Sequence, residues 1–253
     1  MSYVNQFCLF FQSLMNSPIP YNISSLGDSA VTIDYGNIID EKVSFRVHSI
    51  RDWLKCRPFD GLLDIVIGYS SLSVIFDPWL VYHYQKPNGT IFNWIKALLI
   101  EADKAAETAE PETTRVVEIP VCYDQENAPD LLRMSYEKKI GVQEIIQTHF
   151  SRTYRVYMIG FLPGFAYLGQ VEERLATHRK DRPATVRAGS VGIAGQQTGI
   201  YPLNSPGGWN IIGRTPFQLF NIKNDPPVLV QSGDYVKFYP IDLKTFNELN
   251  RNI

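Results

Sequence analysis

The stretch from Arg187 to Thr215 is interrupted by a glycine every few residues, and this spacing is the strongest constraint that the sequence places on the fold. The apolar runs between the glycines are too short for helices. They suit short, tightly turned strands whose backbone approaches another group closely. The glycines are Gly189, Gly192, Gly195, Gly199, Gly207, Gly208 and Gly213. The stretch therefore predicts a β-rich region.

The same stretch supplies many hydrogen-bond donors and acceptors but no carboxylate. Such a set suits an anionic or amide-like small molecule. The alternative is a glycine-rich corner of a β-barrel, in which these groups only satisfy turns. The polar residues are Gln196, Gln197, Thr198, Asn204, Ser205, Asn210, Arg214 and Thr215.

The charge and cysteine content exclude several classes of function. The chain of 253 residues carries 24 basic and 26 acidic residues, a net charge of -2 that gives no broad attraction for nucleic acid or an anionic membrane. Cys8, Cys56 and Cys122 form no CxxC motif, and no histidine lies at metal-ligand spacing. We therefore expect no disulfide framework, no metal site and a reducing compartment.

The first twenty residues contain an apolar cluster, Phe7 to Phe11, without a preceding basic residue or a small-residue cleavage site. The cluster is shorter than a bilayer span. We expect residues 1–20 to be an N-terminal arm on a soluble, cytoplasmic protein. A start codon placed too far upstream is the alternative explanation.

Periodicity predicts alternating strands and helices in the first half of the chain. The predicted elements are a strand at 30–35, a helix from the cap Asp40 to the turn before Pro58, a hairpin of strands at 63–67 and 71–76, and a helix from Ile91. Residues 115–121 are predicted to supply the last strand of a ferredoxin-like domain. A domain boundary is expected near Pro111.

The second half predicts a β-rich domain with a few helices. The predicted elements are helices at 130–134 and 142–150, a strand at 154–159, strands at 228–230 and 235–239 around the turn Ser232-Gly233-Asp234, and a helix at 243–249.

His149 and Arg214 are the residues with the most obvious chemistry. His149 precedes a glycine- and proline-containing loop, where an imidazole suits proton transfer, although a lone histidine is also a common structural residue. Arg214 suits a carboxylate or phosphate, and a structural ion pair is the alternative. Phe161, Phe165 and Tyr167 either wall a pocket or fill a core. His48, His83 and His178 are interpreted as structural or surface residues.

Several motifs occur in an order that resembles a known bacterial family. They are GFLPGFAYLG, AGSVGIAGQQTGIYP, SPGGW and IGRTP, with LGDSAVTIDYG, EIPVCYD and SGDYVKFYPI elsewhere in the chain. The family contains the B subunit of 5-oxoprolinase, the kinase inhibitor KipI and subunit 1 of allophanate hydrolase, and related domains form part of the carboxyltransferase of urea carboxylases. The resemblance implies a ferredoxin-like domain at 21–112 and a cyclophilin-like β-barrel at 113–253.

The resemblance also implies a set of site residues. His149, Gln197 and Arg214 are the predicted catalytic residues, with His149 assisting proton transfer and Arg214 holding a carboxylate or phosphate. The predicted substrate-binding residues are Gln196, Thr198, Tyr201, Ser205, Trp209 and Thr215. The chain departs from the family pattern at Arg182-Pro183, at Val186-Arg187 and in the segment YDQENAPDL, which affects substrate contacts more than the fold.

The activity that the resemblance implies is ATP-dependent opening of 5-oxoproline to glutamate. The implied co-substrate is ATP, with Mg²⁺, and the implied partners are subunits A and C of 5-oxoprolinase, without which the chain is expected to be inactive. One alternative is a KipI-like inhibitor of a sensor histidine kinase. The other is a component of an allophanate hydrolase or urea carboxylase system.

Overall fold

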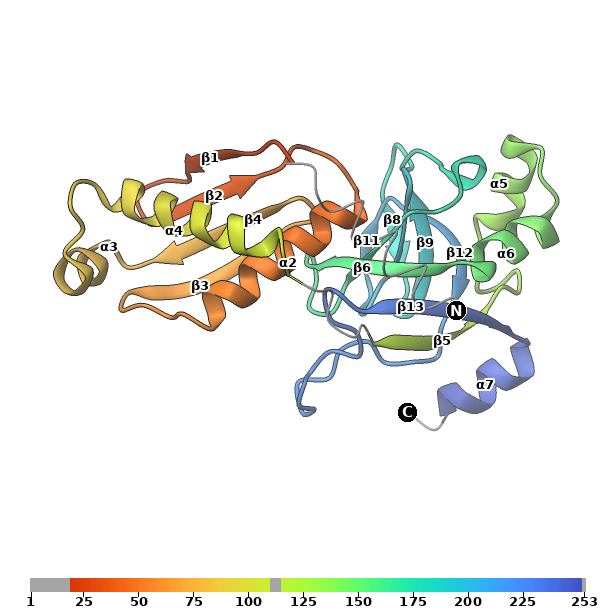
Figure 1. Cartoon of the computed structure of the whole chain (residues 1–253). Coiled ribbons are helices and arrows are strands. Elements are labelled where there is room, and N and C mark those ends of the chain that lie inside the picture. The colour runs from red at the N-terminus through yellow and green to blue at the C-terminus, as the bar shows by residue number, and fades with distance from the viewer. Residues whose placement is uncertain (1–18, 110–114, 252–253) are drawn as a thin grey trace, which may run out of the picture. The chain divides into compact units, whose positions relative to one another are not determined.

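The computed structural model describes residues 19–109 and 115–251, and Figure 1 shows the course of the chain. The chain divides into two compact units, residues 1–112 and 113–253, and each unit is described by itself. The predicted N-terminal arm, 1–20, lies almost wholly outside the described residues.

A four-stranded antiparallel sheet with two long helices on one face forms the first unit. Its elements are β1 (Asn22–Ser25), β2 (Ala30–Asp34), α2 (Glu41–Lys55), β3 (Leu62–Ile67), β4 (Ser71–Phe76), α3 (Pro78–Leu80), the π-helical turn η1 (Val81–Gln85) and α4 (Ile91–Ala106). The strands lie in the order β1-β2-β4-β3, and α2 and α4 cover the sheet in Figure 1. Alternate strand residues such as Val31 and Ile33 form one core with both helices.

Side-chain caps fix where the two long helices begin. Asp40 Oδ1 accepts hydrogen bonds from the backbone N–H groups of Lys42 (2.8 Å) and Val43 (3.1 Å), which confirms the predicted start of α2. Thr90 Oγ1 accepts a bond of 3.1 Å from the N–H of Asn93 at the start of α4. Each cap satisfies donors that have no partner within the first helical turn.

The prediction that residues 115–121 complete the first sheet is wrong. The strand β5 (Val116–Cys122) lies in the second unit, parallel to β13 (Tyr235–Ile241). The edge beside β2 is occupied by β1, which pairs with it around the turn at Gly27, where φ is +67°. A local hairpin satisfies this edge at a lower loop-closure cost than a distant segment would. The ferredoxin-like assignment of this unit stays a prediction.

A closed barrel of seven strands forms the centre of the second unit, in agreement with the predicted cyclophilin-like barrel. The order around the barrel is β10-β7-β6-β13-β5-β12-β9, and β8 and β11 form a separate ribbon. The further bounds are α5 (Leu131–Lys138), α6 (Val142–Ser151), β6 (Thr153–Ile159), β7 (Ala166–Gly169), the 3₁₀ turn η2 (Glu173–Leu175), β8 (Ala184–Val186), β9 (Ser190–Ala194), β10 (Gln197–Ile200), β11 (Ser205–Gly207), β12 (Asn210–Arg214) and α7 (Leu243–Arg251).

Most elements predicted for this unit are confirmed, but the strand at 228–230 is wrong. Among the described residues, Val228 forms only an isolated bridge with Phe220. Pro226 and Pro227 precede it and have no N–H to donate to a ladder, which prevents regular pairing here. The turn at Ser232-Gly233-Asp234 then leads directly into β13.

A buried charged network ties the helices of the first unit to its sheet. Asp103 on α4 accepts a bond of 2.5 Å from the hydroxyl of Tyr35, which follows β2. Arg46 on α2 donates to the backbone oxygen of Asp103 at 2.8 Å, and its Nε lies 3.6 Å from the carboxylate. Burial is the main cause of a raised pKa at Tyr35, and the hydrogen bond to Asp103 raises this pKa further. Because Arg46 and Asp103 are both 5% exposed, the pair is held away from water.

Asp103→Ala is expected to destabilise the first unit by about 2–4 kcal/mol, because it removes the acceptor of the buried Tyr35 hydroxyl and leaves Arg46 with Glu107, at 3.3 Å, as its remaining carboxylate partner. The measurement is urea unfolding followed by tryptophan fluorescence, since Trp53, Trp79 and Trp94 lie in this unit. Glu101→Ala, at an exposed position of the same helix, is the control and should change the stability by less than about 0.5 kcal/mol. Equal unfolding midpoints for the two variants would contradict a structural role for the network.

Candidate functional site

The glycine-rich stretch forms strands of the barrel wall, and its side chains point to both sides of that wall. Along β10, Ile200 lies in the barrel core and Thr198 contacts the buried His149. Gly199 between them faces outward toward Trp209. The polar residues of this stretch therefore do not form one continuous surface.

A second, smaller core of aromatic side chains packs on the outside of the barrel wall. Phe165 is its centre, with ring centroids 5.0 Å from Tyr201 and 5.5 Å from Trp209, both edge to face. Tyr201 and Trp209 are 1% and 4% exposed. Phe165 therefore fills a core, and the predicted substrate-binding residues Tyr201 and Trp209 are held by packing with almost no surface free for a ligand.

Two glycines make room for this outer core. A Cβ on Gly199 would lie 2.9 Å from Cζ3 of Trp209 and 2.9 Å from the backbone oxygen of Ala166. A Cβ on Gly192 would lie 3.1 Å from Cβ of Trp209. At these positions the close approach of neighbouring protein groups, the Trp209 indole at Gly199 and Cβ of Trp209 at Gly192, explains the glycines without a ligand.

His149 lies inside the barrel core in a directed chain of hydrogen bonds. The hydroxyl of Thr198 donates to the backbone oxygen of Gly192 at 3.0 Å, so its oxygen accepts from His149 Nε2 at 3.0 Å. His149 Nδ1 then accepts from the hydroxyl of Tyr123 at 2.9 Å. Every ring nitrogen is satisfied by one neutral tautomer.

Burial keeps this histidine neutral. His149 is 0% exposed, and loss of hydration lowers its pKa from 6.5 to about 3. Its ring also stacks on Phe238, with centroids 4.8 Å apart. A side chain in this position holds the barrel together, and the predicted role in proton transfer would require a path from the core to a substrate.

The stability of the second unit is expected to fall as the pH is lowered from 6.5 to 5. The unfolded chain binds a proton at His149 in this range and the folded chain does not, because the folded pKa is about 3. The free energy of unfolding should decrease by about 2 kcal/mol more than in His149→Gln, since one pKa unit corresponds to about 1.4 kcal/mol. Urea unfolding at several pH values measures this difference.

An independent check uses the folded wild-type protein alone. The imidazole NMR signal of His149 should not titrate between pH 7.5 and 5, because its pKa in the folded protein is about 3. A titration of His149 in this range, or equal pH slopes for wild type and His149→Gln, would contradict the neutral assignment.

The strand register separates the predicted catalytic residues Gln197 and Arg214. Gln197 pairs with Ala194 at one end of β9, and Arg214 pairs with Ser190 at the other end. Four residues of strand between these partners correspond to about 13 Å. The structure therefore does not bring Gln197, His149 and Arg214 into one catalytic group.

Arg214 has part of its guanidinium available for a ligand. Its Nε donates to the backbone oxygen of Ala188 at 2.8 Å, and its Cζ lies 5.5 Å from the ring centroid of Phe246 on α7. The terminal nitrogens make no hydrogen bond to any described residue. Burial and the neighbouring Arg187 lower the pKa of Arg214, whereas Glu126 raises it.

Buried polar atoms without partners occur in the segments around Arg214. Ser205 Oγ and Asn127 Nδ2 have no hydrogen-bond partner among the described residues. Ser205 pairs with Val186, directly before Arg187, and Asn127 follows Glu126, whose backbone oxygen accepts from Arg187 at 2.5 Å. These segments supply donors that suit an anion, and we refer to Arg187, Arg214, Ser205 and Asn127 as the Arg214 cluster.

The remaining predicted binding residues have different environments. Thr215 is 2% exposed, and its Oγ1 accepts from the N–H of Phe217 at 3.1 Å, so it stabilises a turn. Gln196 is exposed at the β9–β10 turn. Gln197 is half-buried, and its Nε2 has no partner among the described residues.

A basic groove of about 620 Å³ lies between α5 and the segment 177–182. It is lined by Arg133, Glu137, Lys138, Thr177, His178, Arg179, Lys180, Asp181, Arg182 and Asn210. Sequence reasoning did not select this groove, although the run from His178 to Arg182 is visibly basic. His178 is exposed, as interpreted from the sequence, and now contributes to the lining.

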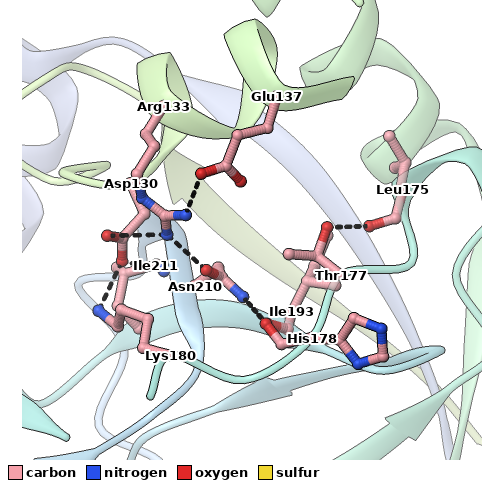
Figure 2. A network of polar contacts seen from close by, with 10 residues as sticks. All are labelled: Asp130, Arg133, Glu137, Leu175, Thr177, His178, Lys180, Ile193, Asn210 and Ile211. Atoms are coloured by element: carbon pink, nitrogen blue, oxygen red, sulfur yellow. Dashed lines mark hydrogen bonds and ion pairs between the residues drawn. The ribbon is translucent and has the colours of Figure 1, made fainter. Parts of the chain in front are cut away.

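Asn210 holds the wall of the basic groove together, as Figure 2 shows. Its Nδ2 donates to the backbone oxygens of His178 (2.8 Å) and Ile193 (3.1 Å), and its Oδ1 accepts from Arg133 at 2.6 Å. Arg133 also donates to Glu137 at 2.8 Å. Asn210 is 1% exposed, so it positions the groove from beneath.

Two further findings concern metal ions and membrane spans. Within 19–109 and 115–251, no group of three or more His, Cys, Asp or Glu side chains is placed to hold a metal ion. None of the helices in these ranges has the length and hydropathy of a membrane span.

The closed barrel and the matching sequence define the class of protein. Residues 21–230 match the family described as the carboxyltransferase domain, subdomain C and D, and the chain belongs to this family. The B subunit of 5-oxoprolinase from Bacillus subtilis (strain 168) is 41% identical over 233 residues, covering 90% of this chain and 96% of that protein. The protein of the same name from Escherichia coli O157:H7 is 45% identical over 216 residues, covering 85% and 94%.

A solved structure and a more distant relative also match this chain. The crystal structure of TTHA0988 is 33% identical with a TM-score of 0.70, and the match covers 84% of this chain but only 40% of that longer chain. Urea amidolyase of Saccharomyces cerevisiae is 22% identical over 262 residues, which cover 14% of that protein.

Proposed function

We propose that this protein is the B subunit of an ATP-dependent 5-oxoprolinase. The observation that carries the proposal is the identity of 41% and 45% to proteins of that name, of which the matches cover 96% and 94%. Over such a length, both the barrel and the first unit are included in the match. In this proposal the first unit is ferredoxin-like, the barrel is cyclophilin-like, and the protein works in the cytoplasm.

The reaction opens a five-membered lactam, whose amide resists direct attack by water. Transfer of the γ-phosphoryl group of ATP to the lactam oxygen turns that oxygen into a leaving group. One water then opens the ring, and the phosphate is released through attack by a second water. The products are glutamate, ADP and phosphate. Mg²⁺ accompanies ATP and neutralises part of its charge.

The Arg214 cluster suits the anionic part of this chemistry. Arg214 offers its terminal guanidinium nitrogens to a carboxylate or phosphate, whereas the neighbouring Arg187 already pairs with Glu126 at 3.7 Å. The donors of Ser205 and Asn127 have no partner among the described residues. In this proposal Arg214 binds the substrate or its phosphorylated form. His149 acts as a positioning residue for Thr198 and the barrel wall, not as the group that transfers the proton.

The proposal assigns the missing groups to partner subunits. Gln196 and Gln197 lie at the opposite end of β9 from Arg214 and do not reach the same ligand. We therefore propose that subunits A and C complete the catalytic site and that the isolated chain is inactive. TTHA0988, in which the matched part is 40% of a longer chain, supports association with further domains.

The alternatives are an inhibitor of a sensor histidine kinase, like KipI, and a component of a urea or allophanate system. The lower identity to urea amidolyase, 22%, ranks the second alternative below the oxoprolinase assignment. Both alternatives predict that no glutamate is formed from 5-oxoproline by the complex that contains this chain.

The test is to purify the tagged protein with its native partners and to measure glutamate released from 5-oxoproline with and without ATP. Glutamate that depends on ATP is the expected result. Arg214→Ala should lower kcat/KM by at least about tenfold, because one charge-assisted hydrogen bond to the substrate is lost.

The matched control is Arg152→Ala, which removes an exposed arginine elsewhere in the same unit and should leave turnover unchanged. Both variants should assemble with the partners and melt at the wild-type temperature. Turnover by the assembled Arg214→Ala complex at the wild-type rate would remove Arg214 from the site, and a copurifying histidine kinase without turnover would overturn the proposed function.

A further inference from the structure

We propose that the basic groove binds the phosphate chain of a small polyanion, and specifically that of ATP. The groove is more basic than the chain as a whole. Five of its ten lining residues are Lys or Arg and two are Asp or Glu, whereas the whole chain has 24 basic and 26 acidic residues. A concave surface of one sign concentrates the electric field and attracts ions of the opposite charge.

Three of the positive side chains in the groove form no ion pair with a described residue. Arg179 and Arg182 make no hydrogen bond or ion pair with any described residue. Among the described residues, Lys138 donates only to the backbone oxygen of Ala176, which carries no net charge. Keeping these like charges together opposes folding, so an anion that separates them would be bound favourably.

The other two basic residues are held in fixed positions. Arg133 is oriented by Glu137 and Asn210, and Lys180 Nζ lies 2.8 Å from Asp130 Oδ2. Asp130 itself accepts from the N–H of Ile211 at 2.7 Å. These bonds tie the groove to β12 of the barrel, as Figure 2 shows.

The segment that carries Arg179 and Arg182 is also anchored on both sides. The N–H of Thr177 donates to the oxygen of Gly195 at 3.1 Å, and the N–H of Gly195 donates back at 2.7 Å. The N–H of Lys180 donates to the oxygen of Gly208 at 2.7 Å. Because the backbone of this segment is already ordered, a ligand binds the groove at a smaller cost in conformational entropy.

The size and chemistry of the groove favour phosphates over a single carboxylate. A volume of about 620 Å³ lies within the range of small-molecule sites. A guanidinium group can bind two phosphate oxygens at once, and three positive side chains without an ion pair to a described residue match a chain of phosphates better than one carboxylate. The choice of ATP among such polyanions rests on the proposed function, whereas the binding of phosphate chains does not.

The experiment is titration calorimetry of the full chain with ATP and, separately, with tripolyphosphate, both without Mg²⁺ at low ionic strength. Both are expected to bind, and their affinity should fall when the salt is raised to about 0.3 M. In the double variant Arg179→Gln, Arg182→Gln the Kd should rise at least about tenfold, because two charge-assisted contacts are lost. Adenosine alone should not bind.

The matched control is the double variant Arg152→Gln, Lys223→Gln, which removes the same charge at exposed positions outside the groove. It should keep the wild-type Kd within about twofold, and both variants should melt like the wild type. Equal weakening in the two double variants would reduce the effect to net charge and overturn the site. Binding of polyglutamate without binding of tripolyphosphate would identify an acidic protein partner instead and would also overturn the proposal.

The binding test and the activity test can fail independently of each other. If the complex releases glutamate with ATP but the isolated chain binds neither ATP nor tripolyphosphate, the groove proposal fails and the oxoprolinase assignment stands. If both polyanions bind in the groove but the complex releases no glutamate, the groove stands as a phosphate site and the proposed function fails.

Discussion

Burial of the barrel wall on both faces is the constraint on which the second unit depends. Strands β9, β10 and β12 have the barrel core on one side and the outer aromatic core around Phe165 on the other. A strand with two buried faces has no solvent-facing positions for ordinary side chains. Gly199 meets this constraint by admitting the Trp209 ring against the backbone, and Gly192 by leaving room for Cβ of Trp209 and the side chain of Ile211. The glycine spacing of the sequence is therefore first a packing requirement.

The same constraint decides the role of the polar side chains within these strands. A hydroxyl or imidazole enclosed by two cores has to find a partner inside the protein, since an unsatisfied group costs about 1–3 kcal/mol. Thr198 and His149 do so by joining one chain from Tyr123 to the backbone of Gly192. This arrangement fixes α6 against the barrel wall. His149, one of the two residues with the most obvious chemistry in the sequence, thus has a structural role.

The sequence predicted the elements with strong local signals and missed relations between distant segments. Periodicity and the Asp40 cap were sufficient for α2 and for the β3–β4 hairpin, because both depend on nearby residues. β1 was missed because Asn-Ile-Ser-Ser has no strand pattern, and β5 was assigned to the wrong sheet because its partner β13 is more than a hundred residues away. The separation of Gln197 from Arg214 depends on strand register, which motif order does not give.

Strand register also explains why the Arg214 cluster and the basic groove lie at two ends of one barrel wall. β12 runs antiparallel to β9, so Asn210 lies at the end that faces the basic groove and Arg214 lies at the opposite end. Between them, the strand is occupied by Ile211, Ile212 and Gly213, all buried. A protein with this arrangement suits a complex in which separate partners complete separate sites.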